Sequence, residues 1–145
     1  MATLVDSNIL LRLLQPNHSQ HAIAKAALAE LQKQKIDLCV AAQNLVELWV
    51  VATRPTNENG LGLSPAKAEK ELAGVRKLFR LLPPSLDVVN VWQGIVTTHT
   101  VLGKKAHDAH LVAVMQVDGV TNILTFNVGD FRRFHGITVI DPAEL

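Results

Sequence analysis

Five oxygen-bearing residues, spread over four parts of the chain, have the side chains that a hard divalent metal ion prefers. They are Asp6, Glu47, Asp108, Asn127 and Asp130. Carboxylate and amide oxygens suit Mg²⁺ or Mn²⁺, and the chain offers no cysteine set and no convincing histidine set for a softer metal. Clustered acids that hold such ions usually activate water for attack on phosphate. These residues therefore indicate metal-dependent hydrolysis of a phosphate ester, provided that the fold brings them together.

Asp6 directly follows an apolar run and directly precedes a helical pattern of apolar residues. Residues 3–5 predict a short buried strand, so Asp6 is expected at the carboxyl end of that strand, where ligands collect in open α/β sheets. Aspartate is also a favoured helix N-cap. This stretch alone supports capping and catalysis equally, and the other acids must decide between them.

Glu47 is the one acid in a largely apolar helical pattern, with Val46 and Leu48 on either side. At helical spacing it shares a stripe with Asn44 and Arg54. A partly exposed glutamate, stabilised by the helix N-terminus or paired with Arg54, would explain the residue without any metal. Taken by itself, Glu47 favours this simpler interpretation.

Asp108 precedes Leu111, Val112 and Met115 by three, four and seven residues, so it projects from the face of a helix that carries core residues. A carboxylate on a buried face is costly unless a cation or several donors receive it. The first turn of the helix supplies part of that support through its free amides. Capping would account for the residue, but a metal ion is the more economical partner.

Asn127 and Asp130 follow a predicted strand at residues 122–125, in a turn that contains Gly129. Asn127 suits an Asx turn and Asp130 suits the cap of a short helix, so both have structural explanations. If all four regions lie where strands end or helices begin, they converge at one edge of a parallel sheet. A shared metal site depends on that convergence.

Strands and helices alternate along the whole chain. The predicted strands are short and apolar and lie at residues 3–5, 36–40, 122–125 and 137–140. Residues 87–89 are either a further strand or an extended connection, and Gly103 and Gly119 are expected to end two of the helices. This order predicts one α/β domain over residues 1–145, a three-layer sandwich with a short, mainly parallel central sheet flanked by helices.

The composition is that of an ordinary globular domain of 145 residues, with 48% hydrophobic and 19% charged residues. The net charge is only +1, so contact with a nucleic acid would need a local basic patch. The lone Cys39 excludes an internal disulfide and a cysteine-based zinc site. We find no signal-peptide pattern and no membrane-spanning run, which predicts a soluble cytoplasmic protein without a membrane partner.

Taken together, these motifs resemble a PIN-domain ribonuclease of the VapC-like type, the toxin of a type II toxin–antitoxin system. The resemblance covers essentially the whole chain in order and spacing. It rests on four stretches: Leu4–Leu14 with Asp6, Val46–Val51 with Glu47, His107–Ala113 with Asp108, and Ile123–Asn127 followed by Asp130 and Phe131. Each stretch alone is weak, but four of them in order make a fairly specific match.

The resemblance implies an endoribonuclease that hydrolyses RNA phosphodiesters with metal-activated water and leaves a 5′-phosphate and a 3′-hydroxyl. It implies that Asp6, Glu47 and Asp108 hold Mg²⁺ or Mn²⁺, and that the partners are RNA, a cognate antitoxin protein and a second copy of the chain. Many relatives have an aspartate two residues after the threonine of the fourth motif, where this chain has Asn127. Asparagine adds no charge, so the occupancy of a second metal site and the role of Asp130 stay open.

Small polar residues and cations beside these motifs are candidates for holding the substrate. We expect Ser7, Asn8 and Thr125 to orient water or phosphate, and Arg54 and Lys104 to hold the RNA backbone. The other flanking cations are Arg12, Lys105, Arg132 and Arg133. For any one of these cations, ordinary surface charge is the simpler explanation.

Two other kinds of function fit parts of the pattern. A non-catalytic α/β binding module would use the acids only as caps or as ion-pair partners. A phosphatase with an aspartyl nucleophile also places an aspartate after its first strand, but such enzymes carry Asp-x-Asp, and Asn8 stands where the second acid should be. Dinucleotide or triphosphate binding is disfavoured because no glycine-rich turn follows the first strand.

Overall fold

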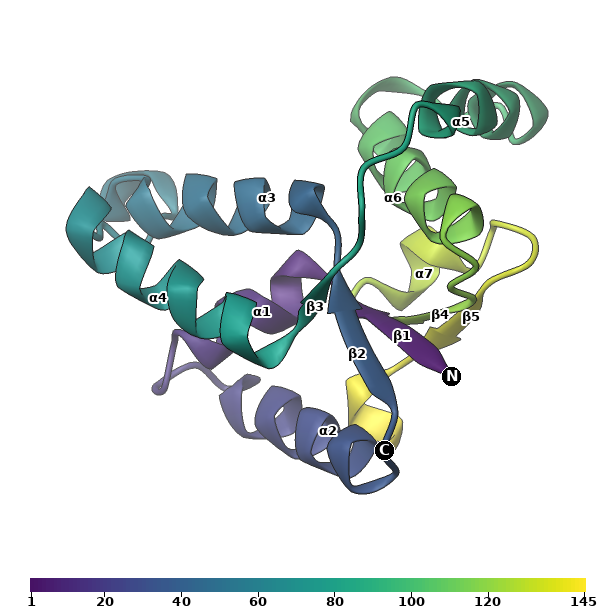
Figure 1. Cartoon of the computed structure of the whole chain (residues 1–145). Helices are drawn as coiled ribbons and strands as arrows, with labels where there is room; N and C mark the ends of the chain where they lie inside the picture. The colour runs from purple at the N-terminus through teal and green to yellow at the C-terminus, as the bar shows by residue number, and fades with distance from the viewer.

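A five-stranded parallel sheet lies at the centre of the computed structural model, which describes all residues from 1 to 145 (Figure 1). Every neighbouring pair of strands is parallel, and their order across the sheet is β3-β2-β1-β4-β5. The strands are β1 (Ala2–Val5), β2 (Asp37–Val40), β3 (Arg80–Leu81), β4 (Asn122–Leu124) and β5 (Thr138–Ile140). The predicted short parallel sheet is confirmed.

Seven helices connect the strands and cover both faces of the sheet. They are α1 (Ser7–Leu13), α2 (His21–Lys33), α3 (Ala42–Thr53), α4 (Pro65–Leu78), α5 (Asp87–Thr98), α6 (Ala106–Val117) and α7 (Val128–Phe131). Three short 3₁₀ turns complete the chain: η1 (Thr56–Glu58), η2 (Gly103–Lys105) and η3 (Pro142–Glu144). None of the helices combines the length and the apolar character that crossing a membrane requires.

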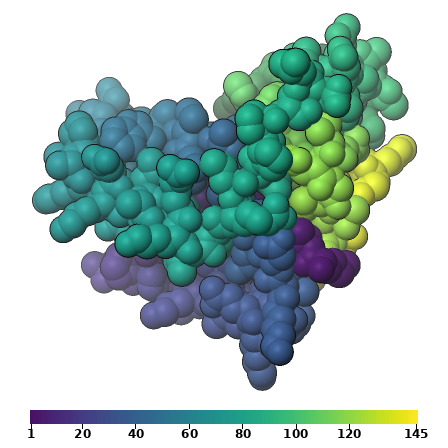
Figure 2. Space-filling model, in the orientation of Figure 1, coloured from purple at the N-terminus to yellow at the C-terminus, as the bar shows by residue number.

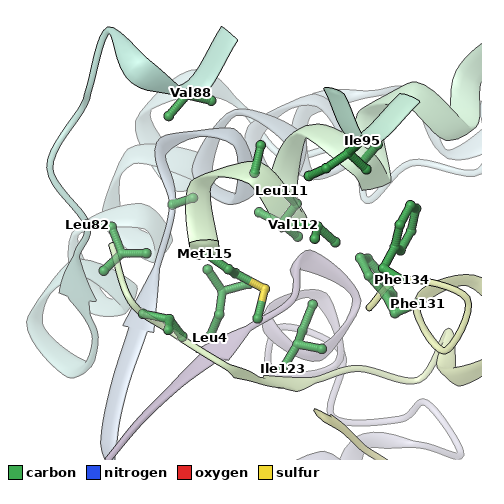
Figure 3. Close-up of a cluster of buried hydrophobic side chains, with 14 of the residues drawn as sticks. Leu4, Leu82, Val88, Ile95, Leu111, Val112, Met115, Ile123, Phe131 and Phe134 are labelled. Carbon is green, nitrogen blue, oxygen red and sulfur yellow. The ribbon is translucent and has the colours of Figure 1, made fainter. Parts of the chain in front are cut away.

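Successive side chains of the central strands point to opposite faces of the sheet, and each face has its own hydrophobic core. Leu4 of β1 and Ile123 of β4 belong to the core under α5 and α6, which Figure 3 shows. Their neighbours Val5 and Leu124 belong to the other core, formed with α1, α2, α3 and α4. All four side chains have no exposed surface. The predicted three-layer sandwich is therefore confirmed.

The order of the strands reverses beside β1. The chain passes from β1 to β2 and β3 on one side, and then returns to place β4 and β5 on the other side of β1. In open parallel sheets such a reversal opens a crevice outside the carboxyl ends of the two strands that flank it. Here those strands are β1 and β4, which end at Val5 and Leu124. The fold itself thus selects the place where Asp6 and Thr125 meet.

The structure corrects two local predictions. Residues 87–89 form the first turn of α5 and not a strand, because the Ser85 hydroxyl accepts a hydrogen bond from the Asp87 amide and Val88 packs into the core under α6. Gly103 does not end α5, which stops at Thr98; it has φ +59° and opens η2 instead. The strand β3 was not predicted, since two exposed residues carry no periodic signal.

Candidate active site

Asp6 lies at the crevice between β1 and β4 and is only 6% exposed. It is the N-cap of α1, where its Oδ1 accepts a hydrogen bond from the Ser7 amide at 2.7 Å. Its Oδ2 accepts a hydrogen bond from the Thr125 hydroxyl at 2.8 Å, across the crevice. Capping and a place in the site are therefore not alternatives for Asp6, because one carboxylate does both.

Asn8 and Thr125 form a second link between the ends of β1 and β4. The Asn8 Nδ2 donates to the Thr125 hydroxyl at 3.1 Å, and the Asn8 Oδ1 accepts a hydrogen bond from the Phe126 amide at 3.2 Å. The Asn127 amide also donates to the Thr125 hydroxyl, at 3.0 Å. These contacts bind the loop after β4 to the start of α1, so both segments hold Asp6 from opposite sides.

Glu47 reaches the same place from α3. Its Oε2 accepts a hydrogen bond from the Ser7 hydroxyl at 2.9 Å, and that hydroxyl also accepts one from Asn44, which has no exposed surface. Glu47 forms no ion pair with Arg54, so the ion-pair explanation for Glu47 is wrong. The helix α3 therefore directs Glu47 toward the residue that follows Asp6.

Asp108 and Asp130 complete the acidic group. Asp108 lies in the first turn of α6 and Asp130 lies in α7. Both line an open pocket of about 390 Å³ that contains no hydrophobic side chain. The lining residues are Glu47, Lys104, Lys105, His107, Asp108 and Asp130. Figure 2 shows the surface dipping between the part built from α3 and α4 and the part built from α5 and α6.

Burial and like charges make Asp6 and Asp108 difficult to ionise. Burial raises the pKa of Asp6 from 3.8 to about 6, and the charges of Glu47 and Asp108 add to this rise, against the hydrogen bonds from Thr125 and Ser7. Burial also raises the pKa of Asp108, with further contributions from Asp130 and Glu47 that Lys105 and His107 partly oppose. The acids of the site therefore interact electrostatically as one group.

Asp6, Glu47 and Asp108 form no ion pair with a lysine or arginine of the chain. The chain has two ion pairs, one between Arg80 and Asp37 and one between Lys105 and Asp130 at 3.2 Å. Neither pair includes Asp6, Glu47 or Asp108. Oxygen-only donors of this kind fit Mg²⁺ or Mn²⁺, and a cation would offset the repulsion that adds to the effect of burial on the pKa values of Asp6 and Asp108.

The side chains are not arranged as a ready-made metal centre. No three His, Cys, Asp or Glu side chains lie close enough together to hold an ion. Carboxylates that repel one another separate when no cation lies between them. Binding of an ion therefore requires rotation of a side chain that hydrogen bonds do not hold, such as that of Asp108, toward Asp6 and Glu47, whose carboxylates are held by Thr125 and Ser7.

The structure separates the predicted site residues into two sets. It brings together Asp6, Ser7, Asn8, Glu47, Lys104, Asp108, Thr125 and Asp130. Arg54 and the side chain of Asn127 lie outside this group. Arg54 follows Glu47 by two helical turns, about 10 Å along α3, and donates to the Asn59 carbonyl at 3.3 Å. The Asn127 side chain is exposed and makes no hydrogen bond, so only its backbone contributes.

Asn44 is a residue of this site for which the sequence analysis predicts no role. Its only signal was its position three residues before Glu47, on the same stripe of the same helix. It is fully buried and connects the Ala41 amide to the Ser7 hydroxyl, at 2.9 and 3.2 Å. A polar residue on an otherwise apolar helix one turn before a candidate acid could have been recognised as a support for that acid.

Comparison with known proteins supports the fold. The sequence model of the PIN domain family matches residues 3–136. No curated protein sequence matches the chain significantly. Among solved structures, VapBC2 from Rickettsia felis bound to a DNA fragment from its promoter has a TM-score of 0.73 at 12% identity, covering 97% of this chain and 98% of the other.

Two further structures are similar over most of their length. FitAcB from Neisseria gonorrhoeae has a TM-score of 0.72 at 21% identity, with 99% of both chains covered. VapC20 from Mycobacterium tuberculosis, described as a toxin that cleaves the sarcin-ricin loop, has a TM-score of 0.61 at 21% identity, with 84% of this chain and 87% of the other covered. At these identities the likeness establishes the shared fold alone.

The raised pKa of Asp6 predicts a specific dependence of stability on pH. Between about pH 4 and about pH 6 the folded chain keeps a proton on Asp6 that the unfolded chain releases, so the free energy of unfolding falls as the pH rises through this window. The expected loss is about 3 kcal/mol, and it stays constant above the window. Urea unfolding in chelator, from about pH 4 to about pH 7, should show this slope in the wild type and a smaller one in Asp6→Asn, where the raised pKa of Asp108 still contributes.

The control for this measurement is Glu69→Gln, which removes an exposed carboxylate from α4. The free energy of unfolding of Glu69→Gln should change with pH by the same amount as that of the wild type. Equal slopes in the wild type and in Asp6→Asn would show that Asp6 ionises freely in the folded protein, contrary to this description of the site.

Proposed function

This chain belongs to the PIN domain family, and from that membership we propose that it is a metal-dependent endoribonuclease that acts as the toxin of a toxin–antitoxin pair. Its substrate is RNA, its cofactor is Mg²⁺ with Mn²⁺ as the alternative, and it acts in the cytoplasm. The observation that carries the proposal is the convergence of Asp6, Glu47 and Asp108 at the carboxyl edge of the sheet, with no protein cation between them.

Asp6, Glu47 and Asp108 are the residues that we propose to hold the ion, with Asp130 beside them. When bound there, a divalent ion lowers the pKa of water and stabilises negative charge on a phosphodiester. The chain itself supplies oriented carboxylates, because Thr125 and Ser7 donate hydrogen bonds to Asp6 and Glu47. A single ion is the simpler expectation, since Lys105 pairs with Asp130 and Asn127 adds no charge.

Cations at the edge of the pocket suit a polyanionic substrate. Lys104 and Lys105 both line the pocket and are exposed, at the N-terminal end of α6. Phosphate contacts from such residues position a nucleic acid without reading its sequence. We retain Lys104 as a candidate contact to the RNA backbone and withdraw Arg54, whose side chain serves the loop after α3.

The phosphatase alternative loses its second acid in the structure. In that mechanism the residue two after the first aspartate acts as an acid, and here it is Asn8. Both ends of the Asn8 amide are already hydrogen-bonded, to Thr125 and to the Phe126 amide. Asn8 thus supports the loop after β4, and the nuclease proposal is the better account of the same residues.

Cleavage of RNA tests the proposed activity. Purified wild type should cleave mixed cellular RNA in Mg²⁺, and chelator should abolish the cleavage. Asp6→Asn and Asp108→Asn should each reduce the rate more than about 100-fold, because loss of even an outer partner of a metal ligand costs about 10–100-fold. Gel analysis of the products, with identification of the 5′ and 3′ ends, is the measurement.

Glu69→Gln is the matched control for this assay, because it changes a distant exposed acid to its amide. It should cut as fast as the wild type. If Asp6→Asn and Asp108→Asn also cut as fast, the activity belongs to a contaminant and the proposed site is wrong. Wild type that neither binds Mn²⁺ nor cleaves any RNA would favour the binding-module function.

Toxicity in cells tests the proposed biological role. A structure from Klebsiella pneumoniae that shares the fold, with a TM-score of 0.67, is described as a toxin–antitoxin complex, and VapC20 is described as a toxin. These likenesses support a cognate antitoxin for this chain. Induced expression of the wild type in a bacterial host should stop growth, whereas Asp108→Asn, which lacks a proposed ligand, should permit it. Growth equal to an empty-vector control after verified expression of folded wild type would refute the toxin role.

We also propose that the chain forms a homodimer. Val46 and Val50 lie one turn apart on α3 and are 63% and 49% exposed, so they form a small apolar face of this helix that a second copy would cover. Sedimentation equilibrium should give the mass of two chains for the wild type and of one chain for the double variant Val46→Lys, Val50→Lys. Leu78→Lys, which changes an exposed leucine of α4, should stay dimeric. A monomeric wild type contradicts the proposal.

A further inference from the structure

Two carboxylates of the site are held by hydrogen-bond chains of the same design. The first chain begins at the Ala41 amide, which donates to the Asn44 Oδ1 at 2.9 Å. The Asn44 Nδ2 donates to the Ser7 hydroxyl at 3.2 Å, and that hydroxyl donates to the Glu47 Oε2 at 2.9 Å. The chain thus runs from a backbone amide, through an asparagine and a hydroxyl, to a carboxylate.

The second chain repeats these steps at the end of β4. The Phe126 amide donates to the Asn8 Oδ1 at 3.2 Å. The Asn8 Nδ2 donates to the Thr125 hydroxyl at 3.1 Å, and that hydroxyl donates to the Asp6 Oδ2 at 2.8 Å. The Asn8 Nδ2 also donates a longer hydrogen bond, at 3.4 Å, directly to the Asp6 Oδ2. The two chains share no residue, although Ser7 and Asn8 are adjacent in the sequence. The same solution therefore occurs twice in one site.

The chemistry of the groups sets the direction of each chain. A backbone amide can only donate, so the oxygen of each asparagine must face it and the NH₂ group must face the hydroxyl. A hydroxyl has a single proton, and once it accepts from the asparagine it places that proton on the remaining acceptor, the carboxylate. Glu47 and Asp6 therefore each accept a hydrogen bond, and a hydroxyl that turned its proton elsewhere would lose that bond.

We propose that Asn44 and Asn8 are positioning residues that act through Ser7 and Thr125 to hold Glu47 and Asp6 in the orientation that binds the cation. This inference rests on the proposed metal-dependent function and deepens it. It gives Ser7, Asn8 and Thr125 a role toward the carboxylates, whereas the sequence predicts that they orient water or phosphate. The Ser7 and Thr125 hydroxyls donate to the proposed metal ligands, and the Asn8 Nδ2 donates to Thr125 and to Asp6.

Asn44 has a simpler structural role from which this one must be separated. By accepting from the Ala41 amide it caps the start of α3, and a cap alone would stabilise the helix without affecting Glu47. A cap acts independently of the Ser7 hydroxyl, whereas a positioning residue acts only through it. A double-mutant cycle between Asn44 and Ser7 distinguishes the two roles.

The experiment measures Mn²⁺ affinity without RNA, by calorimetry, for the wild type, Asn44→Ala, Ser7→Ala and the double variant. Outer partners of metal ligands typically contribute about 10–100-fold in affinity, and we expect Ser7→Ala and Asn44→Ala each to weaken binding within this range. The double variant should bind no more weakly than Ser7→Ala alone. Ser7→Thr, which keeps the hydroxyl, should retain wild-type affinity.

A second cycle, with Asn8→Ala and Thr125→Val, tests the other chain and decides the matter if Asn44→Ala does not fold. Because Asn8 also donates directly to Asp6, this double variant should bind more weakly than Thr125→Val alone, but by less than the product of the two single losses. The positioning role would be overturned by unchanged Mn²⁺ affinity in Asn44→Ala, or by losses of affinity that multiply in the double variant with Ser7→Ala. In that case the proposed function would still stand if the wild type binds Mn²⁺ and Asp108→Asn does not. A wild type that does not bind Mn²⁺ would overturn the proposed function, and this inference with it.

Discussion

Repulsion among carboxylates at the carboxyl edge of the sheet is the constraint around which this molecule is arranged. Asp6 is almost completely buried, and Glu47 and Asp108 are close enough to raise its pKa further. A buried charge persists only if donors are directed at it, and Asp6 receives a backbone amide and a hydroxyl. Of the two ion pairs of the chain, Arg80–Asp37 joins β3 to β2, and Lys105–Asp130 involves only the acid that we place beside the proposed ligands. The site therefore concentrates negative charge that a cation from solution can neutralise.

The rest of the fold supplies the stability that this charge removes. Leu4 and Val5 are completely buried in two separate cores and immediately precede Asp6, so the backbone that carries the carboxylate is fixed from both faces of the sheet. Leu124 and Ile123 do the same for the strand that presents Thr125. Functional sites commonly contain features that destabilise a fold, such as the buried carboxylate of Asp6. Here these features are confined to residues that directly follow the well-packed strands β1 and β4.

Sequence periodicity predicted most of this architecture because the relevant signals are local. An apolar run that ends in Asp6 and an acid on the core face of α6 both follow from spacing alone, and the position of each strand end then implied that the acids converge. Residues 87–89 were misread because three consecutive positions with two valines favour a strand locally, while packing of Val88 against α6 decides for a helix.

The remaining errors concern the directions of individual side chains, which spacing does not encode. Arg54 shares a stripe with Glu47, yet its guanidinium turns to the Asn59 carbonyl in the loop that follows. Asn127 occupies the expected position after β4, but only its amide proton enters the network. The support that Asn44 gives to Ser7 joins residues on different helices, so it becomes visible only when α1 and α3 are packed together.

The hydrogen bond between Thr125 and Asp6 joins residues that are 119 positions apart. During synthesis a chain emerges from its N-terminus, and contacts of such long range form late because most of the intervening chain must first be ordered. Asp6 is made almost at the start, but the partner that orients it does not exist until β4 has been translated. A chain with this topology therefore cannot complete its candidate site while β1 through α6 are being made, because the hydroxyl that orients Asp6 arrives only at the end of β4.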